Sequence, residues 1–188
     1  GLSALVFLSS CDSKVEPDFL STDITGASFG RDFKLSDHNG DLRSLADFRG
    51  KVVLLFFGYT NCPDICPSIM AKLAGAVKNL GKDSNQIQVL FISVDPEHDT
   101  PALLKQYVST FNPNFLGLSG DLETTRNIAK EFKIAFQKQA EATQDSYVME
   151  HSAGTYILDQ KGKLRLYVNT GTNIDIISHD ILELLRTS

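Results

Sequence analysis

The sequence of 188 residues has no tryptophan, only two methionines and only three cysteines, which are Cys11, Cys62 and Cys66. So few cysteines exclude a small scaffold that several disulfides hold together. The chain also has no basic run, and its formal net charge is -5. Binding to the phosphate backbone requires clustered Lys and Arg, so we expect no nucleic-acid partner.

Two sequence features of common enzyme classes are also absent. Gly75 and the triplet Gly81-Lys82-Asp83 miss the spacing of a phosphate-binding P-loop, and no G-x-G-x-x-G is present, which excludes the common nucleotide-binding enzymes. No proline follows Pro113. The cis-proline that thioredoxin-type oxidoreductases place before a late strand is therefore missing.

The chain contains no apolar run of the roughly 20 residues that span a bilayer. Its first ten residues are apolar and small, and they end at Leu8-Ser9-Ser10-Cys11, which resembles the lipobox of bacterial lipoproteins. We interpret residues 1–11 as a truncated signal, lipoprotein or membrane-anchor segment, and residues 12–26 as a linker. This predicts a domain on the extracytoplasmic (periplasmic) face of the bacterial cytoplasmic membrane, anchored through lipidated Cys11 or an N-terminal helix.

Residues 27–188 have the composition of one globular domain, since the whole chain is 42% hydrophobic and 22% charged. The Asn39-Gly40 pair predicts an N-terminal β-hairpin. Continuous apolar runs predict buried strands, and apolar residues at helical spacing predict flanking helices. The order predicts an α/β fold with a mixed central sheet. The expected strands are 51–57, 87–94, 154–158 and 163–168, and the expected helices are about 67–81, 102–111, 121–132 and 174–185.

Cys62 and Cys66 lie between the first buried strand and a helix that we expect to begin at Pro67. If this turn is helical, their α-carbons lie about 6 Å apart on one side, which suits a disulfide or a shared metal. A position at a helix N-terminus should also lower the pKa of the Cys66 thiol. The pair is therefore expected to be reactive or metallated, and the alternative is a disulfide that only staples the turn.

A third metal ligand would come from the four histidines. His38, His98 and His179 lie in turns or on a helix flank, where surface histidines are common, and Asp95 and Asp99 beside His98 are expected to be turn and cap residues. His151 stands directly before a predicted strand, after the polar segment 137–146, which we expect to be mobile without metal. From position alone, His151 is either a ligand or an exposed loop residue.

Three stretches, GYTNCPDICPSIM, ISVDPEHDTP and MEHSAGTYILDQKGKL, resemble the Sco/SenC family of copper proteins that serve cytochrome c oxidase assembly. The resemblance runs from about residue 27 to 186. It implies a thioredoxin-like fold and one copper ion, Cu(I) or Cu(II), per monomer, bound by Cys62, Cys66 and His151. Many relatives instead carry a transmembrane helix at the N-terminus, and relatives often have Arg where this chain has His98.

The resemblance implies a copper metallochaperone and not an enzyme. Its expected client is the CuA site of cytochrome c oxidase subunit II, or another extracytoplasmic cuproprotein, and a copper donor protein would load it. The alternatives are a thiol-disulfide reductase that uses Cys62 and Cys66 as a redox-active pair, or a redox or copper sensor. A peroxiredoxin-like peroxidase fits less well, because Thr60 only approximates the threonine that such enzymes place before the reactive cysteine.

Overall fold

The computed structural model describes residues 14–138, 149–151 and 153–187, with the backbone alone at residues 138 and 149–151. Within these ranges an eight-stranded sheet has the order β1-β10-β9-β4-β5-β6-β2-β3, and β7 pairs with β8 in a small second sheet. The strands are β1 (Thr22–Asp23), β2 (Leu35–Asp37), β3 (Leu42–Arg43), β4 (Val52–Gly58), β5 (Ile87–Ser93), β6 (Leu116–Ser119), β7 (Phe136–Lys138), β8 (Met149–His151), β9 (Thr155–Leu158) and β10 (Leu164–Val168).

The centre of the large sheet is mixed, as the sequence predicts. Strands β4, β5 and β6 are parallel, whereas β9 is antiparallel to β4, and β2 is antiparallel to β6. Every residue of β4 and β5 is buried, because helices or loops cover both faces of a central parallel strand. The predicted α/β class and the hairpin, formed by β2 and β3, are confirmed.

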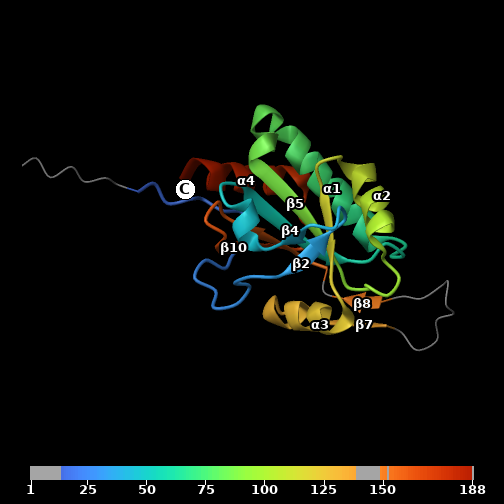
Figure 1. The fold of residues 1–188 in the computed structure, drawn as a ribbon. Coiled ribbons are helices and arrows are strands. Elements are labelled where there is room, and N and C mark those ends of the chain that lie inside the picture. The colour runs from blue at the N-terminus through green and yellow to red at the C-terminus, as the bar shows by residue number, and fades with distance from the viewer. Residues whose placement is uncertain (1–13, 139–148, 152, 188) are drawn as a thin grey trace, which may run out of the picture.

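Helices cover both faces of the sheet (Figure 1). Helices α1, α2 and α4 lie on one face, and α3 lies on the other beside β7 and β8. Thr100 and Asp121 cap α2 and α3, since each side chain accepts a hydrogen bond from the backbone three residues on. The helices are α1 (Ile65–Asn79), α2 (Pro101–Phe111), α3 (Leu122–Glu131) and α4 (Ile174–Thr187), with 3-10 turns at η1 (Leu45–Phe48) and η2 (Gly81–Gln86).

Several boundaries differ from the expectation. Helix α1 begins at Ile65 and not at Pro67, because the turn ends earlier and Pro67 fits within the first helical turn. Strand β6 was not predicted. Part of the polar segment before His151 forms β7, whereas residues 139–148 lie outside the described residues, so the expected mobility of that segment stays a prediction.

Residues 20–23, which lie within the expected linker 12–26, contact the domain. Strand β1 pairs with β10, and the fully buried carboxylate of Asp180 accepts hydrogen bonds from the backbone of Leu20 and Ser21 at 2.9 and 2.8 Å. Cys11 and the rest of residues 1–13 lie outside the described residues. Among the residues that the structure describes, no helix is long and apolar enough to cross a membrane.

Candidate metal and dithiol site

The loop that carries both cysteines leaves the carboxyl end of β4. The carbonyl of Gly58 accepts a hydrogen bond from Val94 at 2.8 Å, which ties the end of β4 to the end of β5. A Cβ at Gly58 would lie 2.8 Å from the Phe91 ring and 3.0 Å from the Cys66 sulfur. Glycine therefore allows the first turn of α1 to pack Cys66 directly against the strand.

The structure brings Cys62 and Cys66 together, and no disulfide joins them. Cys62 is 7% exposed and Cys66 is 0% exposed. The backbone N–H of Cys66 donates to the sulfur of Cys62 at 3.4 Å, and the two side chains are hydrogen-bonded to each other. Two buried sulfurs in contact, of which Cys62 is the more exposed, can bind one metal ion or exchange electrons as a pair.

The expectation that the helix N-terminus lowers the pKa of Cys66 is wrong. Burial raises the pKa of this thiol far above its ordinary value of 9.0, and the hydrogen bond with Cys62 raises it further. The backbone N–H of Tyr59 donates to Cys66 and lowers its pKa, but it does not offset the loss of solvent. Cys66 is thus a neutral thiol until a metal ion or oxidation removes its proton.

Asp99 connects the cysteine loop to the turn that follows β5. Its carboxylate accepts hydrogen bonds from the Thr60 hydroxyl at 2.6 Å, the Thr60 backbone at 3.1 Å and the Ser93 hydroxyl at 2.7 Å. Asp99 is 1% exposed, so these donors replace the water that its charge would otherwise require. The sequence indicated a turn residue here but not this link, which joins segments 39 residues apart.

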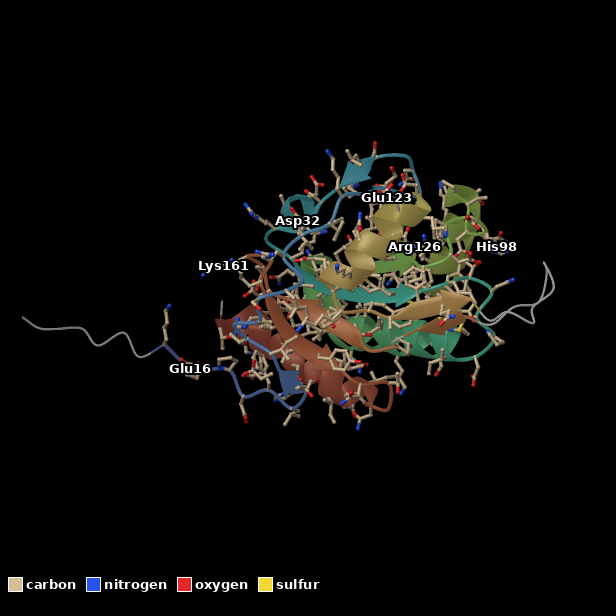
Figure 2. The ribbon with its side chains drawn as sticks, turned by 90° about the horizontal axis from the view of Figure 1, so that it is seen from below. Glu16, Asp32, His98, Glu123, Arg126 and Lys161 are labelled. Atoms are coloured by element: carbon tan, nitrogen blue, oxygen red, sulfur yellow. The ribbon has the colours of Figure 1, made fainter. Side chains whose placement is uncertain are left out.

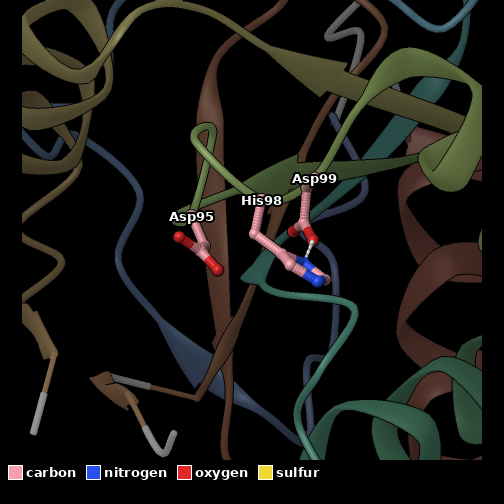
Figure 3. A group of neighbouring side chains, drawn as sticks. All are labelled: Asp95, His98 and Asp99. Carbon is pink, nitrogen blue, oxygen red and sulfur yellow. Dashed lines mark hydrogen bonds and ion pairs between the residues drawn. The ribbon is translucent and has the colours of Figure 1, made fainter. Parts of the chain in front are cut away.

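Asp95, His98 and Asp99 form a second group of potential metal ligands, with ligand atoms within 4.8 Å of one another (Figure 3). His98 Nδ1 lies 3.1 Å from an oxygen of Asp99. Both Asp99 oxygens already accept hydrogen bonds from Thr60 or Ser93. The main role of the cluster is therefore to hold the cysteine loop in position.

The backbone places His151 at the same end of the sheet as the cysteine loop. His151 is the last residue of β8 and pairs with Phe136 of β7. Thr155, four residues later, pairs with Phe56 near the carboxyl end of β4. The side chain of His151 lies outside the described atoms, so its role as a third ligand stays a prediction.

The remaining histidines make contacts elsewhere. His38 accepts a hydrogen bond from the backbone of Gly117 at 3.1 Å, and His179 contacts Asp180 at 3.0 Å.

His98 lies at the end of the molecule opposite to Glu16 of the N-terminal segment (Figure 2). The N-terminal segment therefore leaves the domain far from the cysteine loop.

The SCO1/SenC family model matches residues 21–186 of the chain. Among known proteins, the mitochondrial SCO2 homolog of Bos taurus is 37% identical over 152 residues, which are 80% of this chain and 57% of the bovine protein. The chain thus spans less than two thirds of the length of that relative.

Solved structures share the fold. The structure of Bradyrhizobium japonicum ScoI with copper bound has a TM-score of 0.77 and 34% identity, and the match covers 84% of this chain and 99% of that chain. The structure of BsSco, described as a member of the Sco family of cytochrome c oxidase assembly proteins with a disulfide switch, has a TM-score of 0.69 and 26% identity. That match covers 86% of this chain and 95% of BsSco.

Proposed function

The chain belongs to the SCO1/SenC family, and from that premise we propose that it is a copper chaperone for cytochrome c oxidase assembly. It binds one copper ion through Cys62, Cys66 and His151 and delivers the ion to the CuA site of oxidase subunit II. The observation that carries the proposal is the contact of two buried cysteines, not joined by a disulfide, at the sheet end that the backbone of His151 also reaches.

The donor set suits copper. Two soft thiolates and one imidazole favour Cu(I), whereas a structural zinc site would usually have four protein ligands. Copper binding displaces the thiol protons, and the backbone N–H groups of Tyr59 and Cys66 then hydrogen-bond the negative sulfurs. Cys62 lies nearer the surface than Cys66, so an incoming ligand from the client can reach the ion before Cys66 releases it.

A copper titration of the reduced protein tests the proposal. Wild type should bind one Cu(I) per monomer, and X-ray absorption should report sulfur and nitrogen neighbours. Cys62→Ala or Cys66→Ala should abolish tight binding, and His151→Ala should weaken it or change the coordination. His179→Ala is the matched control, since it removes a histidine that contacts Asp180 of α4 and is not a proposed ligand. Unchanged affinity and spectrum in His151→Ala would contradict the three-ligand site.

The contact between the sulfurs also favours a second function, the reduction of a disulfide in the client's copper site. In this reaction the Cys62–Cys66 dithiol gives two electrons and two protons to the client disulfide, which becomes a dithiol while Cys62 and Cys66 form a disulfide. The related BsSco is described as containing a disulfide switch, which supports this alternative.

One variant separates the two functions. His151→Ala removes a proposed metal ligand and leaves both thiols. It should therefore lower the rate of copper delivery to a soluble CuA domain far more than the rate at which the disulfide of the same domain is reduced. The Cys66→Ala variant should lose both activities. Equal losses in His151→Ala, or a loss of reduction alone, would favour the reductase.

We also propose an extracytoplasmic location, with the domain working as a monomer tethered to the membrane through its N-terminus. The N-terminal segment leaves the domain at the end away from His98 and the cysteine loop, so such a tether would leave the site facing a client (Figure 2). Metabolic labelling with a palmitate analogue tests the lipid anchor, since label should be lost in Cys11→Ala.

A further inference from the structure

Tyr107 of α2 has a buried hydroxyl beside the cysteine loop. Its oxygen is shielded from solvent and has no hydrogen-bond partner among the residues that the structure describes. The ring is held between Phe91 and Phe111, with centroid distances of 5.2 and 5.3 Å. A buried hydroxyl without a partner is costly, and it is uncommon in native proteins unless a function uses it.

The surroundings of Tyr107 include the cysteine loop. Tyr107 lines a pocket together with Thr60 and Asn61, the two residues that directly precede Cys62. The Phe91 ring packs on the Tyr107 ring with a centroid distance of 5.2 Å, and Phe91 and the Cys66 sulfur lie 2.8 and 3.0 Å from a Cβ placed at Gly58, so Phe91 links Tyr107 to the cysteine site. Burial also raises the pKa of Tyr107. The phenol consequently keeps its proton and can only act toward a neighbouring anion as a donor.

We propose that Tyr107 is a positioning residue whose hydroxyl donates a hydrogen bond to a sulfur of the Cys62–Cys66 pair once that sulfur is anionic. This inference rests on the proposed function, in which metal binding or attack on a disulfide makes the sulfurs anionic. A thiol offers only a weak acceptor, so the hydroxyl gains its partner when the thiol proton leaves. Tyr107 would thereby offset part of the cost of placing negative charge on a buried sulfur.

The Tyr107→Phe variant tests the inference, because phenylalanine keeps the ring contacts and removes only the hydroxyl. Tyr156→Phe is the matched control. The hydroxyl of Tyr156 donates to the carbonyl of Phe132 at 2.7 Å, a hydrogen bond within the fold. Without metal, Tyr107→Phe should be at least as stable as wild type in thermal unfolding, whereas Tyr156→Phe should be less stable.

The effects on the cysteine site should be reversed, with Tyr107→Phe changing copper affinity and thiol reactivity and Tyr156→Phe leaving both unchanged. Outer hydrogen bonds to metal ligands commonly change affinity by a factor of 10 to 100. Tyr107→Phe should therefore bind Cu(I) about tenfold more weakly in competition with a chromophoric chelator, and Tyr156→Phe should bind like wild type. In metal-free protein, the rate at which iodoacetamide alkylates the cysteines should fall about tenfold in Tyr107→Phe alone, because a donor to the thiolate is lost.

The outcomes separate this inference from the proposed function. If wild type binds no copper, the chaperone function fails, and the alkylation rates still decide the role of Tyr107. If wild type binds copper and Tyr107→Phe matches it in both affinity and alkylation, the chaperone function stands and the role of Tyr107 is wrong. A loss of stability in Tyr107→Phe equal to that in Tyr156→Phe would assign the hydroxyl to the fold instead.

Discussion

The Thr60 hydroxyl donates to Asp99 at 2.6 Å, so the loop that carries Cys62 is fastened to the turn that follows the neighbouring strand. The backbone N–H of Thr60 donates to the other oxygen of the same carboxylate, and Ser93 at the end of β5 donates there as well. One buried carboxylate thus sets the position of the cysteine loop relative to the sheet.

Removing this acceptor should loosen the loop. Asp99→Ala leaves the Thr60 and Ser93 donors without their partner, so we expect the free energy of unfolding to fall by about 2–3 kcal/mol in urea titrations. Thr60→Val, which removes one donor and keeps the carboxylate, should cost about 1 kcal/mol. An Asp99→Ala protein with wild-type stability and wild-type copper retention would show that the carboxylate does not position the site.

The buried thiol of Cys66 should make the metal-free protein less stable at alkaline pH. In the unfolded chain this thiol ionises near its ordinary pKa of 9.0, whereas burial keeps it protonated in the folded protein. Above about pH 9 the unfolded state therefore loses a proton that the folded state keeps, and stability falls as pH rises, by up to about 1.4 kcal/mol per pH unit.

Denaturant titrations between pH 7 and 11, carried out on wild type and Cys66→Ala, measure this effect. Other groups titrate in the same pH range. The free energy of unfolding is therefore plotted against pH for both proteins, and the difference between the two slopes reports Cys66 alone. Identical slopes would mean that Cys66 ionises as readily in the folded protein as in the unfolded chain.

The carboxylate of Asp180 should hold the N-terminal segment on the domain. Asp180→Ala removes the acceptor of the Leu20 and Ser21 amides, so hydrogen exchange at these amides should accelerate and stability should fall by about 2–3 kcal/mol. Asp180→Asn is the control, because its amide oxygen keeps one acceptor and should retain part of the protection. Unchanged exchange in Asp180→Ala would show that β1 alone holds the segment.

The close contact at Gly58 should make that position intolerant of a side chain. In Gly58→Ala the new Cβ would press on Phe91 and on the Cys66 sulfur, so we expect a loss of about 1–3 kcal/mol and weaker copper binding. Gly171→Ala is the matched control, since nothing lies within 4 Å of a Cβ there. Thermal unfolding of both variants checks this prediction, and equal melting temperatures would refute it.

Local patterns were sufficient for much of the fold. The all-apolar run of β4 predicted a buried strand, and apolar residues at helical spacing predicted α2 to within one residue of its observed start at Pro101. Strand β6 was missed because Gly117 and Ser119 interrupt its apolar residues and have low strand propensity. The pairing of β7 with β8 was missed because its two strands are separated by a polar segment without strand periodicity.

At the site, the sequence by itself identified the residues that we propose carry the chemistry, because the spacing of Cys62 and Cys66 and the motifs around them are local properties of the chain. The ionisation of Cys66 was decided only by the tertiary structure. A helix N-terminus favours a thiolate, but packing against Gly58 and Phe91 removes the solvent that a thiolate needs, and this desolvation dominates. The roles of Asp99 and Tyr107 likewise depend on contacts between segments far apart in the chain, which no local pattern records.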